Sequence, residues 1–490
     1  MRGSWVHNRI FLATASALTV LFAVTTSPAI SPGIAPKADD KGALIVHEWG
    51  TFLSVQGSDG VTLGGMVDND EILPPFVESR SIAAWNRSML RVKGETPVTY
   101  FYTDRPQVVQ VKVEMPDGVL THWYPNVCRF GPRPTGKPET APRNSYLDWC
   151  NVTLLPQGPA LSDKEAELKT EIIVTNKGQI ITGFVTSETA NTVELNEMNR
   201  RGTRTIAKKD IAERAVSIKK IHSAAVLLPV STEQTWRYVR DTDSALVRVE
   251  SFGANGRPVA QFEKFLFYRG VGAFPMPLDV RSMEDRLDGL KLILFNKNQH
   301  ALRGIFAIRV EQKRIQFARL DDLAGMESQG FAADTSFTPP LPLDQGVPQI
   351  KSAVAGELIS GGLYPKEAQA MVNTWERSYF RSEGLRILYL VPRERVDAVL
   401  PIHIKPAPDK LIRVMVGRIE VLTPMREKQI EKFVADLGSN DFSTREAASA
   451  GLARLGRLGE PALRRVLVST PDPEVRSRAR VLIGRFGSGK

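Results

Sequence analysis

Residues 44–55 read LIVHEWGTFLSV, a run that alternates in the manner of a β-strand. Similar runs recur as far as residue 423, with turn signals such as Pro116-Asp117-Gly118 between them: PVTYFYTDRPQVVQVKV, VLTHWY, SALVRVESF, EKFLFYRGV, LKLILFN, RGIFAIRVEQKRIQFARL, LRILYLV and LIRVMVGRIEVL. Many short strands separated by turns predict a mainly β body that resembles a β-sandwich, built from residues 44–160 and 217–423. The alternation of strands and helices that would indicate a parallel βαβ fold is absent from the sequence.

One helix is expected within this body, at residues 364–381. A proline at position 365 suits the first turn of a helix, and apolar side chains follow at helical spacing at Ala368, Met371, Val372, Trp375 and Tyr379. Such a stripe is more often core packing than a ligand site. We therefore expect the helix to dock on the sheet just before the strand LRILYLV.

Residues 168–216 form a separate unit within the body. About five short strands, with a turn at Asn176-Lys177-Gly178, resemble the small SH3/Sm-like β-barrels that occur as modules in large exported bacterial proteins. The flanking runs TLLP (153–156) and VLLP (226–229) indicate an insertion. Barrels of this kind can bind RNA, but an exported protein rarely meets RNA. We therefore interpret the unit as a spacer or docking module and do not expect nucleic acid as a partner.

The C-terminal part, residues 424–490, is predicted to be all-α. Apolar residues recur at spacings of three and four in four segments: 427–437, 443–455, 460–468 and 472–486. Ser443 and Asp472 precede two of these helices as caps, and Gly438 and Gly456 follow the ends of the segments 427–437 and 443–455. The pattern from Asp441 to Gly456 resembles a HEAT-like repeat. Such repeats do not bury their faces alone, so the free faces are expected to rest on the β body or on a protein partner.

The N-terminus is typical of a secretory signal peptide. Arg2 and Arg9 precede an uncharged apolar run at 10–24, which is shorter than the roughly 20 residues that span a bilayer. Small residues permit cleavage after Ala29, which predicts a signal peptide at 1–29 and a linker at 30–43. The alternative is an uncleaved N-terminal anchor. The first cysteine is Cys128, so the protein is not expected to be a lipoprotein, and the mature chain is expected to contain no transmembrane span.

Two cysteines, Cys128 and Cys150, flank a loop rich in proline and glycine. In an oxidising compartment they are expected to form a disulfide, which would contribute roughly 3 kcal/mol by closing a loop of that length. The alternative is a pair of buried free thiols. Two cysteines are too few for a cysteine-rich zinc module.

The motif VHEWGTF at 46–52, followed by SVQGSDG, resembles the opening of an uncharacterised family of exported bacterial proteins. The resemblance continues through ETPVTYFY (95–102), THWYPN (121–126), EKFLFYRGVGAF (263–274), GLYPKEAQAMVNTWERSYF (362–380), LRILYLVPR (385–393) and LIRVMVGRIEVLTP (411–424). It covers most of residues 44–424 outside the inserted unit. The family has no established activity, so the resemblance implies an organisation of the chain and no chemistry.

No catalytic signature is visible, and the leading hypothesis is an exported, non-enzymatic scaffold. It would dock a protein partner through 424–490 and through 168–216, with an anionic cell surface as another partner. The alternative is a hydrolase or carbohydrate-active enzyme, with candidate catalytic residues His47, Glu48, Glu95, Glu263 and Arg269. No cofactor is expected beyond calcium, whose candidate ligands are the acidic loop residues Asp68, Asp70 and Glu71.

The net charge of +10 is unevenly distributed. Residues 424–490 hold 13 basic and 8 acidic side chains, and residues 168–216 hold 8 and 6. The predicted signal peptide carries two further arginines, so the large β body is nearly neutral. This distribution favours docking by basic modules over a charged active-site groove.

Overall fold

The computed structural model describes residues 42–65, 73–82, 89–132, 143–156, 166–197, 203–221, 228, 233–252, 258–285 and 289–487. The predicted signal peptide and nearly all of the predicted linker fall outside these ranges, as do Asp68, Asp70 and Glu71. Within the described part the protein is mainly β, with several sheets and a C-terminal helical segment, as predicted. No helix of that part is long and apolar enough to cross a membrane.

Ten strands form the main sheet of the body, in the order β2-β5-β15-β3-β1-β24-β22-β18-β19-β21. Their bounds are Glu78–Ser79 (β2), Gly118–Tyr124 (β5), Leu266–Gly272 (β15), Val92–Tyr102 (β3), Ile45–Gln56 (β1), Lys410–Val421 (β24), Gly384–Leu390 (β22), Arg303–Glu311 (β18), Arg314–Arg319 (β19) and Leu341–Pro342 (β21).

At the centre of this sheet, the first and the last strand of the body in sequence lie side by side. β1 and β24 run parallel, from Ile45 opposite Lys410 to Gln56 opposite Val421. All twelve residues of β1 are buried, because the sheet is covered on both faces. The parallel pairing of β1 and β24 was not expected from the sequence, because the two strands are far apart in the chain. Glu48 of β1 and its partner Arg413 of β24, for example, are 365 positions apart.

Two further sheets pack against one face of the main sheet. One has the order β14-β13-β7-β4-β23, with β6 paired to β7, and the other has the order β16-β17-β20. A hydrophobic core that includes Phe52, Trp149 and Leu292 fills the space between the layers. The bounds are Pro258–Glu263 (β14), Leu246–Phe252 (β13), Ser145–Leu155 (β7), Gln107–Met115 (β4), Ile402–Lys405 (β23), Arg129–Gly131 (β6), Leu278–Asp285 (β16), Gly289–Asn296 (β17) and Ser328–Ala332 (β20).

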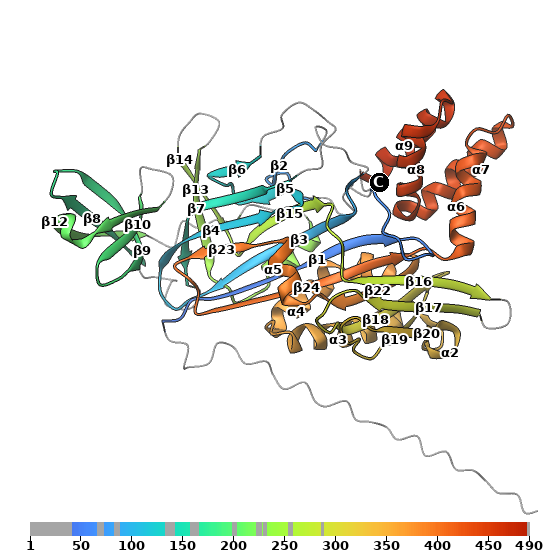
Figure 1. The fold of residues 1–490 in the computed structure, drawn as a ribbon, viewed down its shortest axis with the longest axis horizontal. Helices are drawn as coiled ribbons and strands as arrows, with labels where there is room; N and C mark the ends of the chain where they lie inside the picture. The colour runs from blue at the N-terminus through green and yellow to red at the C-terminus, as the bar shows by residue number, and fades with distance from the viewer. Residues whose placement is uncertain are drawn as a thin grey trace, which may run out of the picture.

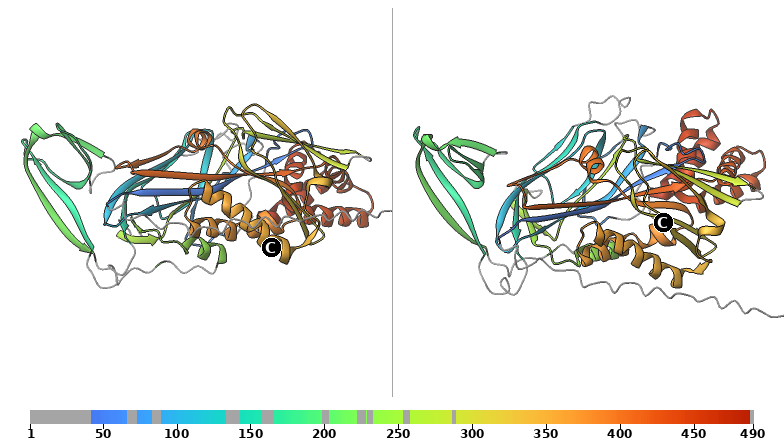
Figure 2. Two further views of the ribbon diagram at one scale, coloured as in Figure 1. Left: turned by 90° about the horizontal axis from the view of Figure 1, so that it is seen from below. Right: turned by 60° about the horizontal axis from the view of Figure 1, so that its bottom comes forward.

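Helices cover the opposite face of the main sheet (Figure 2). They are α1 (Gln234–Arg240), α3 (Leu343–Ser360), α4 (Pro365–Thr374) and the π-helical turn η5 (Arg377–Arg381). Trp49 of β1 packs in the second core with Met371 and Trp375. The range predicted as one helix, 364–381, is divided into α4 and η5. The sequence reading missed α3, because Gly346 and Pro348 near its start are helix-breaking residues. Two short helices, α2 (Ala333–Ser336) and α5 (Arg393–Val399), complete the body.

Four helices follow the body: α6 (Pro424–Asp436), α7 (Phe442–Leu455), α8 (Glu460–Ser469) and α9 (Pro473–Gly487), with a 3₁₀ turn, η6 (Gly456–Gly459), before α8. They match the four predicted segments closely. The cap of α7 is Asp441 rather than the predicted Ser443, because the Asp441 carboxylate accepts a hydrogen bond from the backbone N–H of Thr444 at 2.7 Å. Leu53 and Val55 of β1 belong to the hydrophobic core of these helices.

The inserted unit is a five-stranded antiparallel sheet in the order β11-β10-β9-β8-β12. Its bounds are Ala166–Thr175 (β8), Ile180–Glu188 (β9), Thr192–Glu197 (β10), Thr203–Ala207 (β11), Lys208–Asp210 (the 3₁₀ turn η3) and Ile211–Ile221 (β12). The unit therefore extends slightly beyond the predicted 168–216. Figure 1 shows it at one end of the body, with the C-terminal helices at the other.

Candidate functional site

His47 lies on β1 beneath the helical layer, and its side chain is buried. Its Nδ1 donates to Oε2 of Glu367 at 2.7 Å. Glu367 also accepts from the hydroxyl of Tyr102 at 2.8 Å and from the backbone N–H of Tyr364 at 2.7 Å. Because Glu367 is the third residue of α4, the pair fastens the start of that helix to the sheet.

Glu48, the next residue, points to the opposite face of the sheet. Its Oε2 accepts from Nε of Arg413 at 2.6 Å, and its Oε1 accepts from the hydroxyls of Tyr268 and Thr99. Arg413 also donates to Asp397 and to the carbonyl of Leu400, both at 2.7 Å. Burial alone would lower the pKa of Arg413, but Glu48, Tyr268 and Asp397 together outweigh burial, and the pKa lies above its ordinary value. Glu48 and Arg413 thus form a buried ion pair within the sandwich.

Glu95 lies on the same face as His47 but farther along the sheet, opposite Thr51. It contacts Lys93 at 3.0 Å, Arg457 of η6 at 3.5 Å and Arg418 at 3.9 Å. Arg418 continues the network to Glu420 at 2.6 Å, and Glu420 pairs with Arg386 at 3.1 Å. These groups connect the main sheet to the C-terminal helices through buried charges.

Arg269 borders the same network. Burial lowers the pKa of Lys93, and the positive charge of Arg269 lowers it further while Glu95 opposes the shift. Burial also lowers the pKa of His122 to about 3, with Arg269 and Lys93 adding to the effect. The structure therefore brings Arg269 and Glu95 together around Lys93, and leaves His47 and Glu48 elsewhere.

Glu263 forms a fourth, separate group. Both of its oxygens accept from Arg240 of α1, at 3.0 and 2.7 Å, and Oε2 also accepts from the indole N–H of Trp236 at 3.0 Å. This carboxylate anchors α1 to the body. All five candidate catalytic residues are at most 3% exposed. Each lies within packed side chains, and they form four separate polar groups. Four of the residues lie in the main sheet, whereas Glu263 ends β14 of a neighbouring sheet.

The cysteine pair lies at disulfide distance, with Cα atoms 5.9 Å apart. Together with Asp148, the two cysteines form the one group of potential metal ligands found in the described part of the chain. A disulfide occupies both sulfurs, so this group offers no metal site in the oxidised protein. The predicted calcium ligands Asp68, Asp70 and Glu71 lie outside the described residues.

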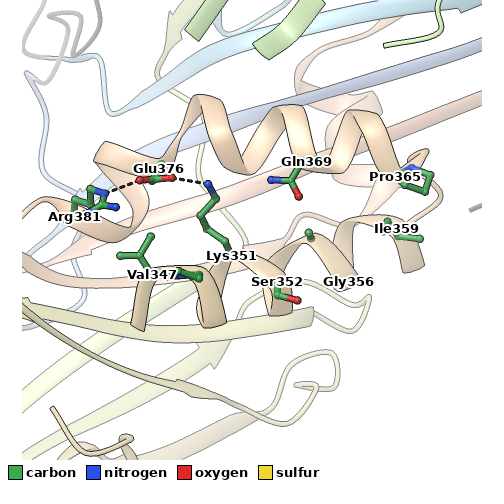
Figure 3. Close-up of a pocket in the computed structure, with 11 residues that line it drawn as sticks. Val347, Lys351, Ser352, Gly356, Ile359, Pro365, Gln369, Glu376 and Arg381 are labelled. Carbon is green, nitrogen blue, oxygen red and sulfur yellow. Dashed lines mark hydrogen bonds and ion pairs between the residues drawn. The ribbon is translucent and has the colours of Figure 1, made fainter. Parts of the chain in front are cut away.

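A groove lies between α3 and α4 on the outside of the helical layer, with a volume of about 420 Å³ (Figure 3). Glu376 accepts from Lys351 at 2.5 Å and from Arg381 at 2.6 Å at one end, while Ile359 and Pro365 lie at the other. The sequence analysis assigned none of these residues to a binding site. It missed the groove because α3, which supplies one wall, was not predicted.

The period of a β-strand could have separated His47 from Glu48 in advance, because successive side chains point to opposite faces. Glu367 also carried a signal, since a glutamate in the first turn after Pro365 is typical of a helix start. No protein-family model and no curated protein matches the chain.

Proposed function

We propose that the protein is an exported, non-enzymatic scaffold that binds a protein partner through its C-terminal helices. The observation that carries this proposal is the surface of α6–α9. Met425, Phe442, Val468 and Val481 expose 69, 63, 83 and 53% of their surface there. We interpret these four side chains, one on each of the C-terminal helices, as part of a docking surface.

The arrangement of the helices supports the HEAT-like interpretation of 424–490. α6 packs on α7, α8 packs on α9, and the two pairs stack through α6–α8 and α7–α9 contacts. In repeat proteins the terminal unit needs a polar outer face if nothing covers it. Val468 and Val481 belong to the last pair, so a partner helix or strand would cover apolar surface there.

The inserted unit has features that support an SH3/Sm-like interpretation. Its first strand, β8, pairs with the last strand, β12, and the 3₁₀ turn η3 connects the last two strands of the unit. The unit has its own small core, which includes Ile173, Val193 and Leu195. We propose it as a second docking module of the same scaffold.

Export is part of the proposal, and two structural facts are compatible with it: the disulfide-distance cysteine pair and the absence of a membrane-spanning helix in the described residues. Membership of the exported VHEWGTF family is proposed on the sequence motifs. In the structure β1 and β24, which carry two of those motifs, lie side by side at the centre of the main sheet. The motifs therefore coincide with the framework of the body.

The sealed polar groups favour a scaffold over a hydrolase. A glycosidase-type mechanism needs two carboxyl groups facing one substrate space. Glu48, Glu95 and Glu263 are instead neutralised by Arg413, Lys93 and Arg240 in separate buried pairs. Buried pairs of this kind hold layers in register and present no accessible acid or base.

The proposal is tested with two matched surface variants of the whole chain. Val468→Glu alters the C-terminal surface, and Met326→Glu alters an exposed apolar position, 59% exposed, on the β body outside both proposed docking modules. Thermal unfolding first shows that both variants fold. Each variant is then purified by affinity from the envelope fraction of the source cells, together with any protein bound to it. We expect a stoichiometric partner that wild type and Met326→Glu retain and Val468→Glu loses. Absence of any partner, or equal retention by both variants, would refute the proposal.

An anionic surface is the second candidate partner, because Arg454, Arg465 and Arg480 are exposed on α7, α8 and α9. Surface arginines attract anionic lipids by roughly 1 kcal/mol each near the membrane. Co-sedimentation with phosphatidylglycerol vesicles tests this. Charge reversal at Arg465 and Arg480 should abolish binding, whereas Val468→Glu should leave most of it.

A further inference from the structure

The groove between α3 and α4 is lined mainly by apolar groups. Several residues that α3 contributes are small and leave its volume unfilled. Ser352, Ala355 and Gly356 line it, and a Cβ added to Gly356 would meet no atom within 4 Å. Pro348, Ile359 and Pro365 add apolar surface. Its volume of about 420 Å³ falls in the range of small-molecule sites, roughly 300–1,000 Å³.

One end of the groove carries an excess of positive charge. Lys351 and Arg381 share a single carboxylate, that of Glu376 (Figure 3). Burial alone would raise the pKa of Glu376, but the two cations outweigh it and the pKa lies below its ordinary value. Glu376 therefore stays ionised at neutral pH, and the three groups together carry one net positive charge.

Arg381 is accessible and held on a fixed turn. Its side chain is 43% exposed, and it donates to Glu376 through Nε. The turn that carries it is the π-helical segment η5, a rare geometry that often occurs at functional sites. Arg386 holds this turn from beneath by donating to the carbonyls of Tyr379 at 2.9 Å and Ser382 at 2.7 Å.

We propose that this groove binds a free monocarboxylate with an unbranched apolar chain of medium length. The carboxylate would lie against Arg381 and Lys351, and the chain would run along α3 toward Ile359 and Pro365. Ile359 follows Lys351 by eight positions on the helix, which gives this path a length of about 12 Å and suits a medium-chain acid. The site is separate from the C-terminal surface and does not depend on the scaffold function.

Isothermal titration of the whole chain with sodium decanoate, below its micelle concentration, tests the proposal. Decanol and decyltrimethylammonium have the same chain and serve as neutral and cationic probes. We expect decanoate to bind at least tenfold more tightly than either, because a charge-assisted contact is roughly twice as strong as a neutral one. Equal affinity for the three probes, or no binding of decanoate, would overturn the proposal.

Three variants locate the binding. Gly356→Leu fills the groove, and it is compatible with the fold because the position is open and leucine favours a helix more than glycine does. It should abolish decanoate binding while thermal unfolding stays at or above the wild-type temperature. Arg381→Gln should weaken binding about tenfold. The matched control is Arg319→Gln, which removes an exposed arginine paired with Glu357 of α3 outside the groove and should bind as wild type does. Wild-type affinity in Gly356→Leu, or equal losses in Arg381→Gln and Arg319→Gln, would refute the assignment.

The same titration distinguishes a free monocarboxylate ligand from the C-terminal carboxylate of a peptide. A short apolar peptide with a free C-terminal carboxylate is compared with its C-terminal amide. If the free-acid peptide binds and decanoate does not, the groove recognises a protein terminus and the proposal is wrong.

Discussion

The two units attached to the β body differ in how they are joined to it. The C-terminal helices share a hydrophobic core with Leu53 and Val55 of β1, and Arg457 reaches the buried Glu95. The inserted unit has a core of its own, and the ion pair between Lys405 and Glu194, at 3.1 Å, lies at the surface. Sequence reasoning treated both as added modules. The difference shows that only the inserted unit is an appendage, whereas the C-terminal helices complete the body.

The largest difference between the two units is expected when each is deleted and the unfolding of the body is measured. Deletion of residues 425–490 exposes Leu53, Val55 and Leu422, at a cost of about 1.5–3 kcal/mol for each side chain. That loss is comparable with the whole stability of many domains, so we expect the body to lose cooperative unfolding. Replacement of residues 166–221 by a short Gly/Ser linker should leave the melting of the body unchanged.

Tryptophan fluorescence measures this contrast cleanly, because neither 166–221 nor 425–490 contains a tryptophan. The indoles of Trp49, Trp123, Trp149, Trp236 and Trp375 all report on the body. If the chain without residues 425–490 unfolded like wild type, the C-terminal helices would be an independent module after all.

A single buried contact should give the next largest effect. Arg457→Ala removes the cation that the C-terminal helices contribute to Glu95, whose side chain is 2% exposed. Lys93 and Arg418 remain near this carboxylate, so we expect a loss of about 1–3 kcal/mol rather than complete unfolding. Urea denaturation followed by tryptophan fluorescence gives the value. No change would mean that the two regions are joined by apolar packing alone.

Acid should affect the two units through different causes. Hydrogen bonds from Arg214 and Lys208 lower the pKa of Glu188 in the inserted unit to about 2, and those from Ser443 and Thr444 lower the pKa of Asp441 in the C-terminal helices to about 2. Because both values lie below the ordinary 4.5 and 3.8, the stabilisation is present above those ordinary values and is lost as the pH falls through about 2.

Salt separates these causes. Cations hold the Glu188 carboxylate, so high salt should raise its pKa toward 4.5 by screening. Neutral donors hold Asp441, so its pKa should stay low. Carboxyl carbon shifts measured by NMR at low and high salt check this. Equal shifts at both sites would contradict the assigned causes.

The smallest effect is expected for the surface link of the inserted unit. Lys405→Ala breaks the pair with Glu194, in which the lysine side chain is 54% exposed. Exposed pairs contribute little, so the change in unfolding free energy should stay within about 0.5 kcal/mol. The same denaturation assay applies. A loss as large as that of Arg457→Ala would remove the distinction between the two units.

Much of the secondary structure could be predicted because it depends on local pattern. The alternation in β1 and the caps of the C-terminal helices indicated those elements with nearly correct bounds. α3 could not be recognised in the same way, because Gly346 and Pro348 lower local helix propensity and packing of Ile350 and Val354 against the sheet compensates. The groove that depends on α3 was therefore missed as well.

For the candidate site, too, the sequence did not reveal the partners of the residues that it suggested. His47 and Glu48 were singled out from the sequence as candidate catalytic groups of the alternative enzyme. Their partners, Glu367 and Arg413, lie more than 300 positions away, at separations of 320 and 365. Nothing local in the sequence couples such residues, so whether a buried acid is catalytic or neutralised was not predictable.

The sequence by itself determined the strand-rich body, the helical C-terminus and the opposite orientation of His47 and Glu48, because these follow from periods of 2 and 3.6 residues along the chain. Only the tertiary structure decided that β1 pairs in parallel with β24, that each candidate acid is neutralised, and that the C-terminal helices complete the body. These outcomes depend on which distant surfaces bury one another, and burial is a property of the packed layers rather than of any segment.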